Sequence, residues 1–148
     1  MKKLLLGGAA SLFATVLPAQ NPVHWNYTLQ KIANNTFEVR LRATIDPSWH
    51  IYSQLQPEDA IALPTKISFK ANALLRLQGK PRELGKLEKY TDENLGISAN
   101  QYSGGVEFVQ DIILKAKART NVSGNIEYQA CTDERCLLPK TVSFSLKL

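Results

Sequence analysis

Apolar and polar residues alternate along much of this chain, and this period of two decides which fold class it can adopt. From Thr36 to Ile45 every second residue is apolar, and the residues between them are Glu, Arg or Thr. Such alternation is typical of a β-strand that buries one face and leaves the other in water. The pattern also runs from Val23 to Leu29, and Asn34-Asn35 lies between the two segments. We therefore predict a β-hairpin with its turn at the two asparagines.

Five further segments carry the signals of short strands bounded by Pro, Gly or Asn. They cover residues 49–53, 65–70, 106–118, 125–132 and 141–148. Turns are predicted at Asp46-Pro47, at Gly104-Gly105 and at residues 121–124, and one turn of helix at residues 71–77. About seven short strands of antiparallel type predict an all-β domain built as an immunoglobulin-like β-sandwich, with a small barrel as the alternative.

One long segment, from Gly79 to Gly105, is rich in charged residues and shows no clear alternation. We expect it to form a long loop on the sandwich. Long ordered loops on a rigid scaffold often carry function, although a flexible connection is the commoner explanation.

The first residues have the layout of a secretory signal. Met1-Lys2-Lys3 precedes an uncharged stretch from Leu4 to Leu17, and Pro18-Ala19-Gln20 follows it. The apolar run has about 14 residues, whereas a membrane-spanning helix needs about 20. We predict a signal peptide at residues 1–19, cleaved after Ala19, and a single secreted domain at residues 20–148.

The charge of the chain argues against nucleic acid as a partner. The formal net charge is +5, and removal of Lys2 and Lys3 lowers it to +3. The remaining basic residues are spread along the chain and form no patch in the sequence, whereas nucleic-acid binding requires a concentrated basic surface.

The chain holds two cysteines, Cys131 and Cys136, and in an oxidising compartment they are expected to form one intramolecular disulfide. The bond is either a structural staple or a redox-active pair. A loop this short stabilises the fold by only about 2 kcal/mol in the chain-entropy description, which favours reversible chemistry. If the strand that begins at Asn125 continues, Cys131 points away from the core and its sulfur lies near solvent or beneath a loop.

No metal and no cofactor are expected. Zinc would need two further ligands, and His24 and His50 do not have the spacing of a ligand pair. The cysteines lack the two-residue spacing of thioredoxin-type catalysts. No nucleophile elbow and no phosphate-binding glycine loop occurs in the sequence.

Three segments together resemble a known family. They are residues 49–53, with the sequence WHIYS, residues 85–90, with the sequence GKLEKY, and the cysteine segment from Tyr128 to Pro139. This combination is similar to the amino-terminal periplasmic domain of the DsbD-type thiol:disulfide interchange proteins. The resemblance covers nearly all of residues 20–148.

The resemblance implies an immunoglobulin-like sandwich with a redox-active disulfide at one end, shielded by a flexible cap loop. Cys136 would form the mixed disulfide with a partner, and Cys131 would resolve it. The cap would lie between Tyr90 and Leu95, with Leu95 over the sulfurs. The polar and aromatic wall of the site would include His50 and Tyr52, and Tyr90 would belong to the cap.

The resemblance also implies a location and a set of partners. The domain would act in the periplasm as a monomer with protein-disulfide reductase activity. Its electron donor would be a membrane-embedded thiol carrier, expected here on another protein. Its acceptors would be disulfide isomerases or thioredoxin-like proteins, including those of cytochrome c maturation. The alternative function is a secreted immunoglobulin-like binding module that acts through its loops and whose disulfide is purely structural.

Overall fold

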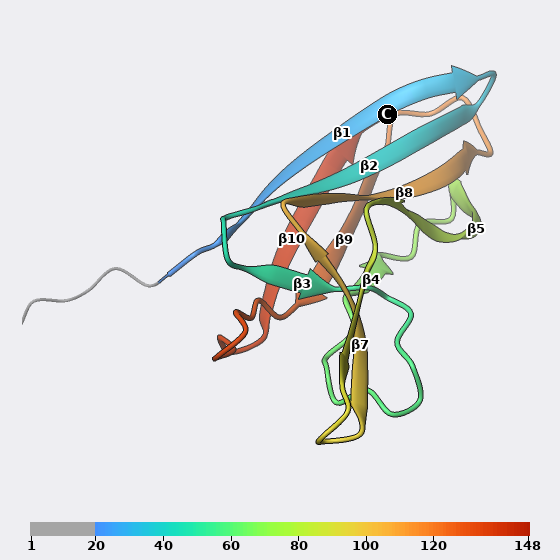
Figure 1. Cartoon of the computed structure of the whole chain (residues 1–148). Coiled ribbons are helices and arrows are strands. Elements are labelled where there is room, and N and C mark those ends of the chain that lie inside the picture. Colours follow the sequence, from blue (N-terminus) through green and yellow to red (C-terminus); the bar gives the residue numbers. More distant parts are fainter. Residues whose placement is uncertain (1–19) are drawn as a thin grey trace, which may run out of the picture.

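The computed structural model describes residues 20–148, which form ten β-strands in three sheets (Figure 1). The strands are β1 (Val23–Ala33), β2 (Thr36–Ile45), β3 (His50–Tyr52), β4 (Lys66–Phe69), β5 (Leu75–Gly85), β6 (Glu88–Asp92), β7 (Ile97–Ser103), β8 (Gly105–Leu114), β9 (Asn121–Tyr128) and β10 (Lys140–Lys147). The predicted signal peptide lies outside the described residues. Within residues 20–148 no helix is long and apolar enough to cross a membrane.

Two of the sheets pack face to face and confirm the predicted immunoglobulin-like sandwich. One has the order β1-β2-β8-β5, and the other has the order β10-β9-β4. Alternate residues of β2, β8 and β9 fill the space between them, and Leu41, Phe108 and Ile126 are at most 1% exposed. The predicted hairpin is also confirmed, because β1 pairs with β2 and Asn35 adopts the left-handed φ of 59° at the turn.

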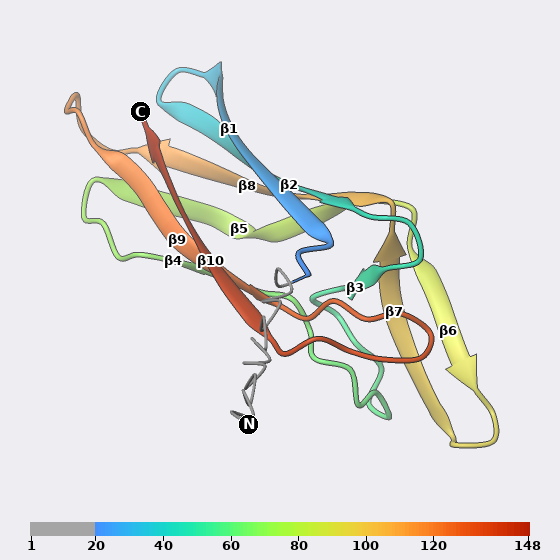
Figure 2. The same ribbon diagram turned by 90° about the vertical axis from the view of Figure 1, so that its left-hand side faces the viewer.

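The third sheet, with the order β3-β7-β6, projects from one end of the sandwich (Figures 1 and 2). β5 leads through a short connection into β6, and β7 leads through Gly104 into β8. The paired strands β5 and β8 therefore continue beyond the sandwich as the paired strands β6 and β7. The expectation of a long loop from Gly79 to Gly105 is therefore corrected, because this segment forms a bent β-hairpin. Most of β6 is exposed, so no buried face imposes alternation on its sequence.

Two local predictions are wrong for identifiable reasons. Residues 71–77 form no helix; a turn leads directly into β5 at Leu75. Residues 121–124 are not a turn but the first half of β9, where Gly124 allows close packing. A Cβ atom at Gly124 would overlap the carbonyl oxygen of Ser68 on β4 and would approach the Phe144 ring to 2.7 Å. This glycine therefore marks a close approach of backbones within a sheet.

Candidate functional site

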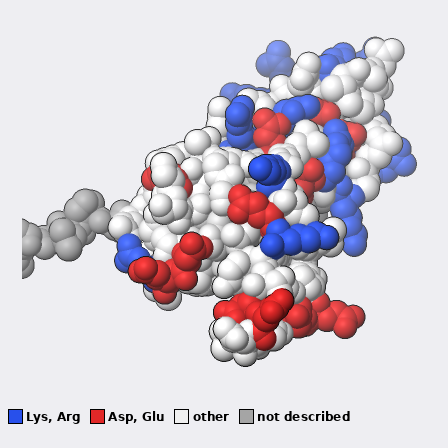
Figure 3. Space-filling model, viewed as in Figure 1, with Lys and Arg blue, Asp and Glu red and all other residues white. Residues whose placement is uncertain are grey.

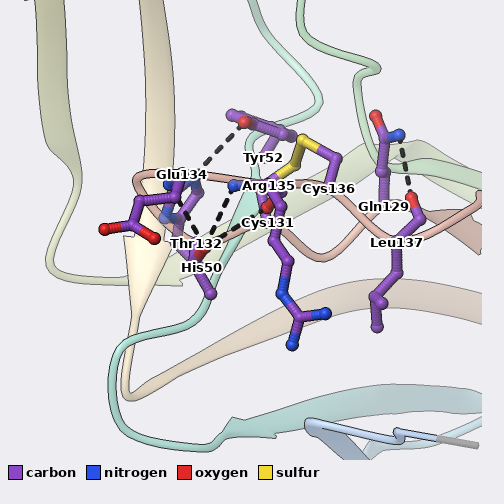
Figure 4. The surroundings of a disulfide bond; sticks show 9 residues. All are labelled: His50, Tyr52, Gln129, Cys131, Thr132, Glu134, Arg135, Cys136 and Leu137. Carbon is purple, nitrogen blue, oxygen red and sulfur yellow. Dashed lines mark hydrogen bonds between the residues drawn. A yellow bond between two sulfur atoms is a disulfide. The ribbon is translucent and has the colours of Figure 1, made fainter.

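The disulfide between Cys131 and Cys136 lies just beyond the end of β9, where the sandwich meets the third sheet (Figure 4). The two Cα atoms are 4.0 Å apart, because the chain reverses between them. The Thr132 amide donates to the carbonyl oxygen of Arg135 at 2.7 Å. The Thr132 hydroxyl oxygen accepts hydrogen bonds from the amides of Glu134 and Arg135 at 3.2 and 3.1 Å. The short loop is thus closed by its own hydrogen bonds as well as by the sulfurs.

Hydrogen bonds on both sides of this loop fix it to the rest of the domain. The amides of His50 and Cys131 each donate to the other residue's carbonyl oxygen, at 2.9 and 3.0 Å. After the loop the Leu137 amide donates to the carbonyl oxygen of Ala130 at 2.9 Å, and the Gln129 side chain donates to the Leu137 carbonyl oxygen at 3.0 Å. Cys131 is therefore held against β3 independently of the disulfide.

The two sulfur-bearing residues differ sharply in exposure. Cys131 is 1% exposed, whereas Cys136 belongs to the exposed residues. Ala130 belongs to the sandwich core, whereas Cys131 belongs to a separate buried cluster with Tyr52 and Ala99. Of the two predicted positions for the Cys131 sulfur, the one near solvent is wrong, and burial beneath a loop agrees with the packing of Ala62 against this cluster. The accessible end of the bond is Cys136.

A cavity of about 230 Å³ opens beside Cys136. Three of the residues predicted for the site line it together with this cysteine, namely His50, Tyr52 and Tyr90. Leu95 lies in the turn between β6 and β7, is 70% exposed and is not part of the cavity lining. The structure thus assembles the predicted wall and the aromatic part of the cap segment but leaves Leu95 outside.

Sequence reasoning missed the segment that approaches the disulfide from the opposite side, residues 53–65. Ala62 packs against the buried cluster of Tyr52, Ala99 and Cys131. Ile61 also lines the cavity, although 83% of it is exposed. The apolar run from Ala60 to Leu63, between Pro57 and Pro64, is the signal that the sequence offers for this segment.

The His50 and Tyr52 side chains in the wall beside Cys136 are polar and uncharged at neutral pH. Burial lowers the pKa of His50, an effect opposed by the carboxylates of Asp133 and Glu88. Burial also raises the pKa of Tyr52, and Tyr90 adds to this shift. The His50 Nε2 atom lies 3.2 Å from the Tyr52 hydroxyl, so the two side chains satisfy each other. Neither side chain supplies a positive charge next to the exposed sulfur.

Arg135 is the basic residue of the disulfide loop, and its guanidinium points away from the sulfurs (Figure 4). Its Cζ atom lies 5.5 Å from the centroid of the Trp49 ring, and its Nη2 donates to Gln20 at 2.6 Å. The charge of Arg135 is therefore directed to the outer surface. Across the described part of the chain, no group of three or more His, Cys, Asp or Glu side chains is placed to hold a metal ion.

The fold and the site define a class of protein, an immunoglobulin-like β-sandwich with a disulfide at its end that joins one buried and one exposed cysteine. The family model described as thiol:disulfide interchange protein DsbD, N-terminal, matches residues 16–148, and the chain belongs to this family. A comparison with the curated proteins finds no significant match.

Solved structures support the same fold at low sequence identity. The N-terminal periplasmic domain of ScsB from Proteus mirabilis is 16% identical, with a TM-score of 0.55, and the match covers 89% of this chain but 48% of that one. The chain therefore spans about half the length of the ScsB domain. The reduced DsbD N-terminal domain from Neisseria meningitidis is 19% identical, with a TM-score of 0.53, and the match covers 88% of this chain and 89% of that one. A complex of the DsbD and PilB N-terminal domains from N. meningitidis also matches, at 18% identity and a TM-score of 0.50, over 82% of this chain and 80% of that one.

Proposed function

We propose that this domain exchanges disulfides with partner proteins through Cys136, with Cys131 as the resolving cysteine. The observation that carries the proposal is the unequal exposure of the two cysteines, because an incoming thiolate must reach the sulfur that it attacks. Cys136 offers such a sulfur beside an open cavity, and Cys131 is held in the interior by its hydrogen bonds to His50.

In the reducing direction the domain begins with two thiols. The Cys136 thiolate attacks one sulfur of the partner's disulfide, a bond forms between the two proteins, and the partner's second sulfur leaves as a thiolate. The Cys131 thiolate then attacks the Cys136 sulfur and expels the partner. Two electrons pass from the domain to the partner, which takes up two protons as a dithiol. The domain is left with its own disulfide. When a thiol donor reduces this bond again, the domain can react with a further partner and so acts as a protein-disulfide reductase.

The partners follow from membership of the family and from the nature of the chemistry. We propose a membrane-embedded thiol carrier as the donor and periplasmic thioredoxin-like proteins or disulfide isomerases as the acceptors. The ScsB domain is described as periplasmic, and one DsbD domain is described in complex with a PilB domain, which supports a periplasmic exchange partner. An oxidising compartment is also where such a disulfide persists.

Matched single-cysteine variants test the order of attack. Cys131→Ala retains the exposed thiol and Cys136→Ala retains the buried one, and each is mixed with the uncharged 2-hydroxyethyl disulfide. Adduct formation is followed by mass spectrometry. We expect Cys131→Ala to form the mixed disulfide at least about tenfold faster, since each 1.4 kcal/mol needed to open the site slows the buried thiol tenfold.

Equal rates for the two variants would show that exposure does not direct the exchange. If neither variant forms an adduct while both remain folded, the domain is not an exchange module, and the structural disulfide of a binding module becomes the better account.

A further inference from the structure

A second cavity adjoins the one beside Cys136. It has a volume of about 340 Å³ and shares His50, Gln101 and Asp133 with the first. The two cavities therefore share part of their lining, and we call them together the groove. A partner that is covalently attached at Cys136 would have its neighbouring residues placed along this groove.

Three carboxylates line the second cavity. Asp133 comes from the disulfide loop, Glu88 from the start of β6 and Asp46 from the turn after β2. No Lys or Arg belongs to its lining among the described residues. Asp46 lies 3.0 Å from His24 Nε2, and Glu88 accepts a hydrogen bond from Ser103 at 3.3 Å. The groove is thus acidic in a chain whose formal net charge is +5.

Acidic side chains also gather on two neighbouring parts of the surface. On the face shown in Figure 3, acidic side chains gather on the disulfide loop and on the free end of the β6–β7 hairpin, whereas most of the basic ones lie over the sandwich. Arg135, the nearest basic residue in sequence to Cys136, has its guanidinium on Trp49 and Gln20. Arg135 is therefore not among the residues that line the groove, although the Trp49 ring beneath its guanidinium is.

We infer that the exchange site selects partner proteins in which a Lys or Arg side chain lies close to the reactive cysteine, with that cation seated between Asp133 and Glu88. This inference rests on the proposed exchange at Cys136 and adds the charge of the partner. Complementary charge accelerates encounter and disfavours partners of the wrong sign. Among several possible acceptors, this domain would therefore react fastest with those whose surface is basic around the reactive cysteine.

Three matched peptide disulfides test the inference. They differ in one residue, Lys, Gln or Glu, placed two positions from the cysteine, and each is mixed with the reduced protein at low salt. Every rate is divided by the rate of the same peptide with 2-mercaptoethanol, which removes differences in intrinsic reactivity. We expect the Lys peptide to react about threefold faster than the Gln peptide and the Glu peptide about threefold slower, the size of one exposed charge pair.

Charge-neutralising variants locate the effect. Asp133→Asn and Glu88→Gln should each lower the ratio of the Lys to the Gln rate, whereas Glu127→Gln, on β9 opposite Lys66, removes the same charge elsewhere and should leave the ratio unchanged. About 0.5 M salt should bring the ratio close to one, because screening then acts over a few ångströms.

Equal rates for the three peptides, or a ratio that both groove variants leave intact, would overturn the inference while the exchange itself stands. If not even the uncharged Gln peptide reacts, the proposed function fails and the inference fails with it.

Discussion

Reduction of the Cys131–Cys136 bond should leave the domain folded and only slightly less stable. The sequence separation of the two cysteines is 5, so the bond closes a very short loop. In the chain-entropy description, a closed loop of about six residues stabilises the fold by about 2 kcal/mol. A domain of this size has a total stability of roughly 5–15 kcal/mol, so most of it remains after reduction.

The structure explains why the loss should stay small. The loop is also closed by the hydrogen bond from the Thr132 amide to the Arg135 carbonyl oxygen, and Cys131 is bound to His50 through both backbones. These hydrogen bonds do not depend on the sulfur–sulfur bond. With an unfolding entropy of about 2.1 cal/mol/K per residue, 2 kcal/mol corresponds to a fall in Tm of about 7 °C for residues 20–148.

Thermal unfolding followed by circular dichroism, with and without an excess of dithiol reductant, measures this difference. The Cys136→Ala variant is the matched control, because it removes the disulfide by changing only the exposed cysteine, and its Tm should lie close to that of the reduced protein. A fall of more than about 20 °C, or the loss of a cooperative transition, would show that the bond is a structural staple and would refute the reasoning.

Three further changes test the fold and the environment of the site. Gly124→Ala should destabilise the domain by about 3 kcal/mol, seen as a lower urea midpoint, because its Cβ meets the Ser68 carbonyl oxygen and the Phe144 ring; an unchanged midpoint would contradict the packing of β4 on β9. Burial lowers the pKa of His50 from 6.5, so the unfolded chain binds the proton more readily, and the stability that this residue contributes above pH 6.5 should be lost as the pH falls through the lowered pKa. Urea unfolding between pH 7 and 5 should show a weaker pH dependence in His50→Gln than in the wild type, and equal slopes would count against a buried neutral imidazole. Burial together with the nearby Glu83 carboxylate raises the pKa of Tyr102 to about 12, so Tyr102→Phe should remove an ultraviolet absorbance change near pH 12, and its survival in the variant would assign it elsewhere.

The sandwich could be predicted because burial acts on one face of its strands. Phe37, Val39 and Leu41 alternate with Glu38 and Arg40 on β2, and the structure buries Val39 and Leu41 in the core. The outward-facing Arg40 forms ion pairs with Glu38 and Glu107, as its place on the solvent face would suggest. The apolar positions of the pattern thus correspond to core residues, and the polar position Arg40 corresponds to ion pairs outside the core.

The projecting hairpin could not be predicted in the same way. Lys89, Tyr90 and Thr91 are all exposed, so neither face of β6 has to be apolar. Its partner β7 lies in the same segment, where the many charged residues made a loop the simpler prediction. β6 pairs with its sequence neighbour β7, but the other partner of β7 is the distant β3, and that pairing is not visible in a local window. The same limit explains why Gly124 looked like part of a turn.

The site was predicted in its composition but not in its orientation. His50, Tyr52, Tyr90 and Cys136 line one cavity, and the roles that the resemblance to the family implies for them stay predictions. Which cysteine is buried depends on where β9 ends and on the pairing of Cys131 with His50, far away in the sequence. Ile61 joins the cavity for a similar reason, because only the folded chain brings residues 53–65 beside the hairpin.

The reduction potential of the Cys131–Cys136 bond tests the exchange function most directly. It can be measured by equilibrating the domain with defined mixtures of reduced and oxidised dithiothreitol or glutathione and counting free thiols by alkylation. We predict a value above about −300 mV, within reach of the thiol carriers of an oxidising compartment. A potential well below that mark would identify a structural disulfide and would contradict the proposed function.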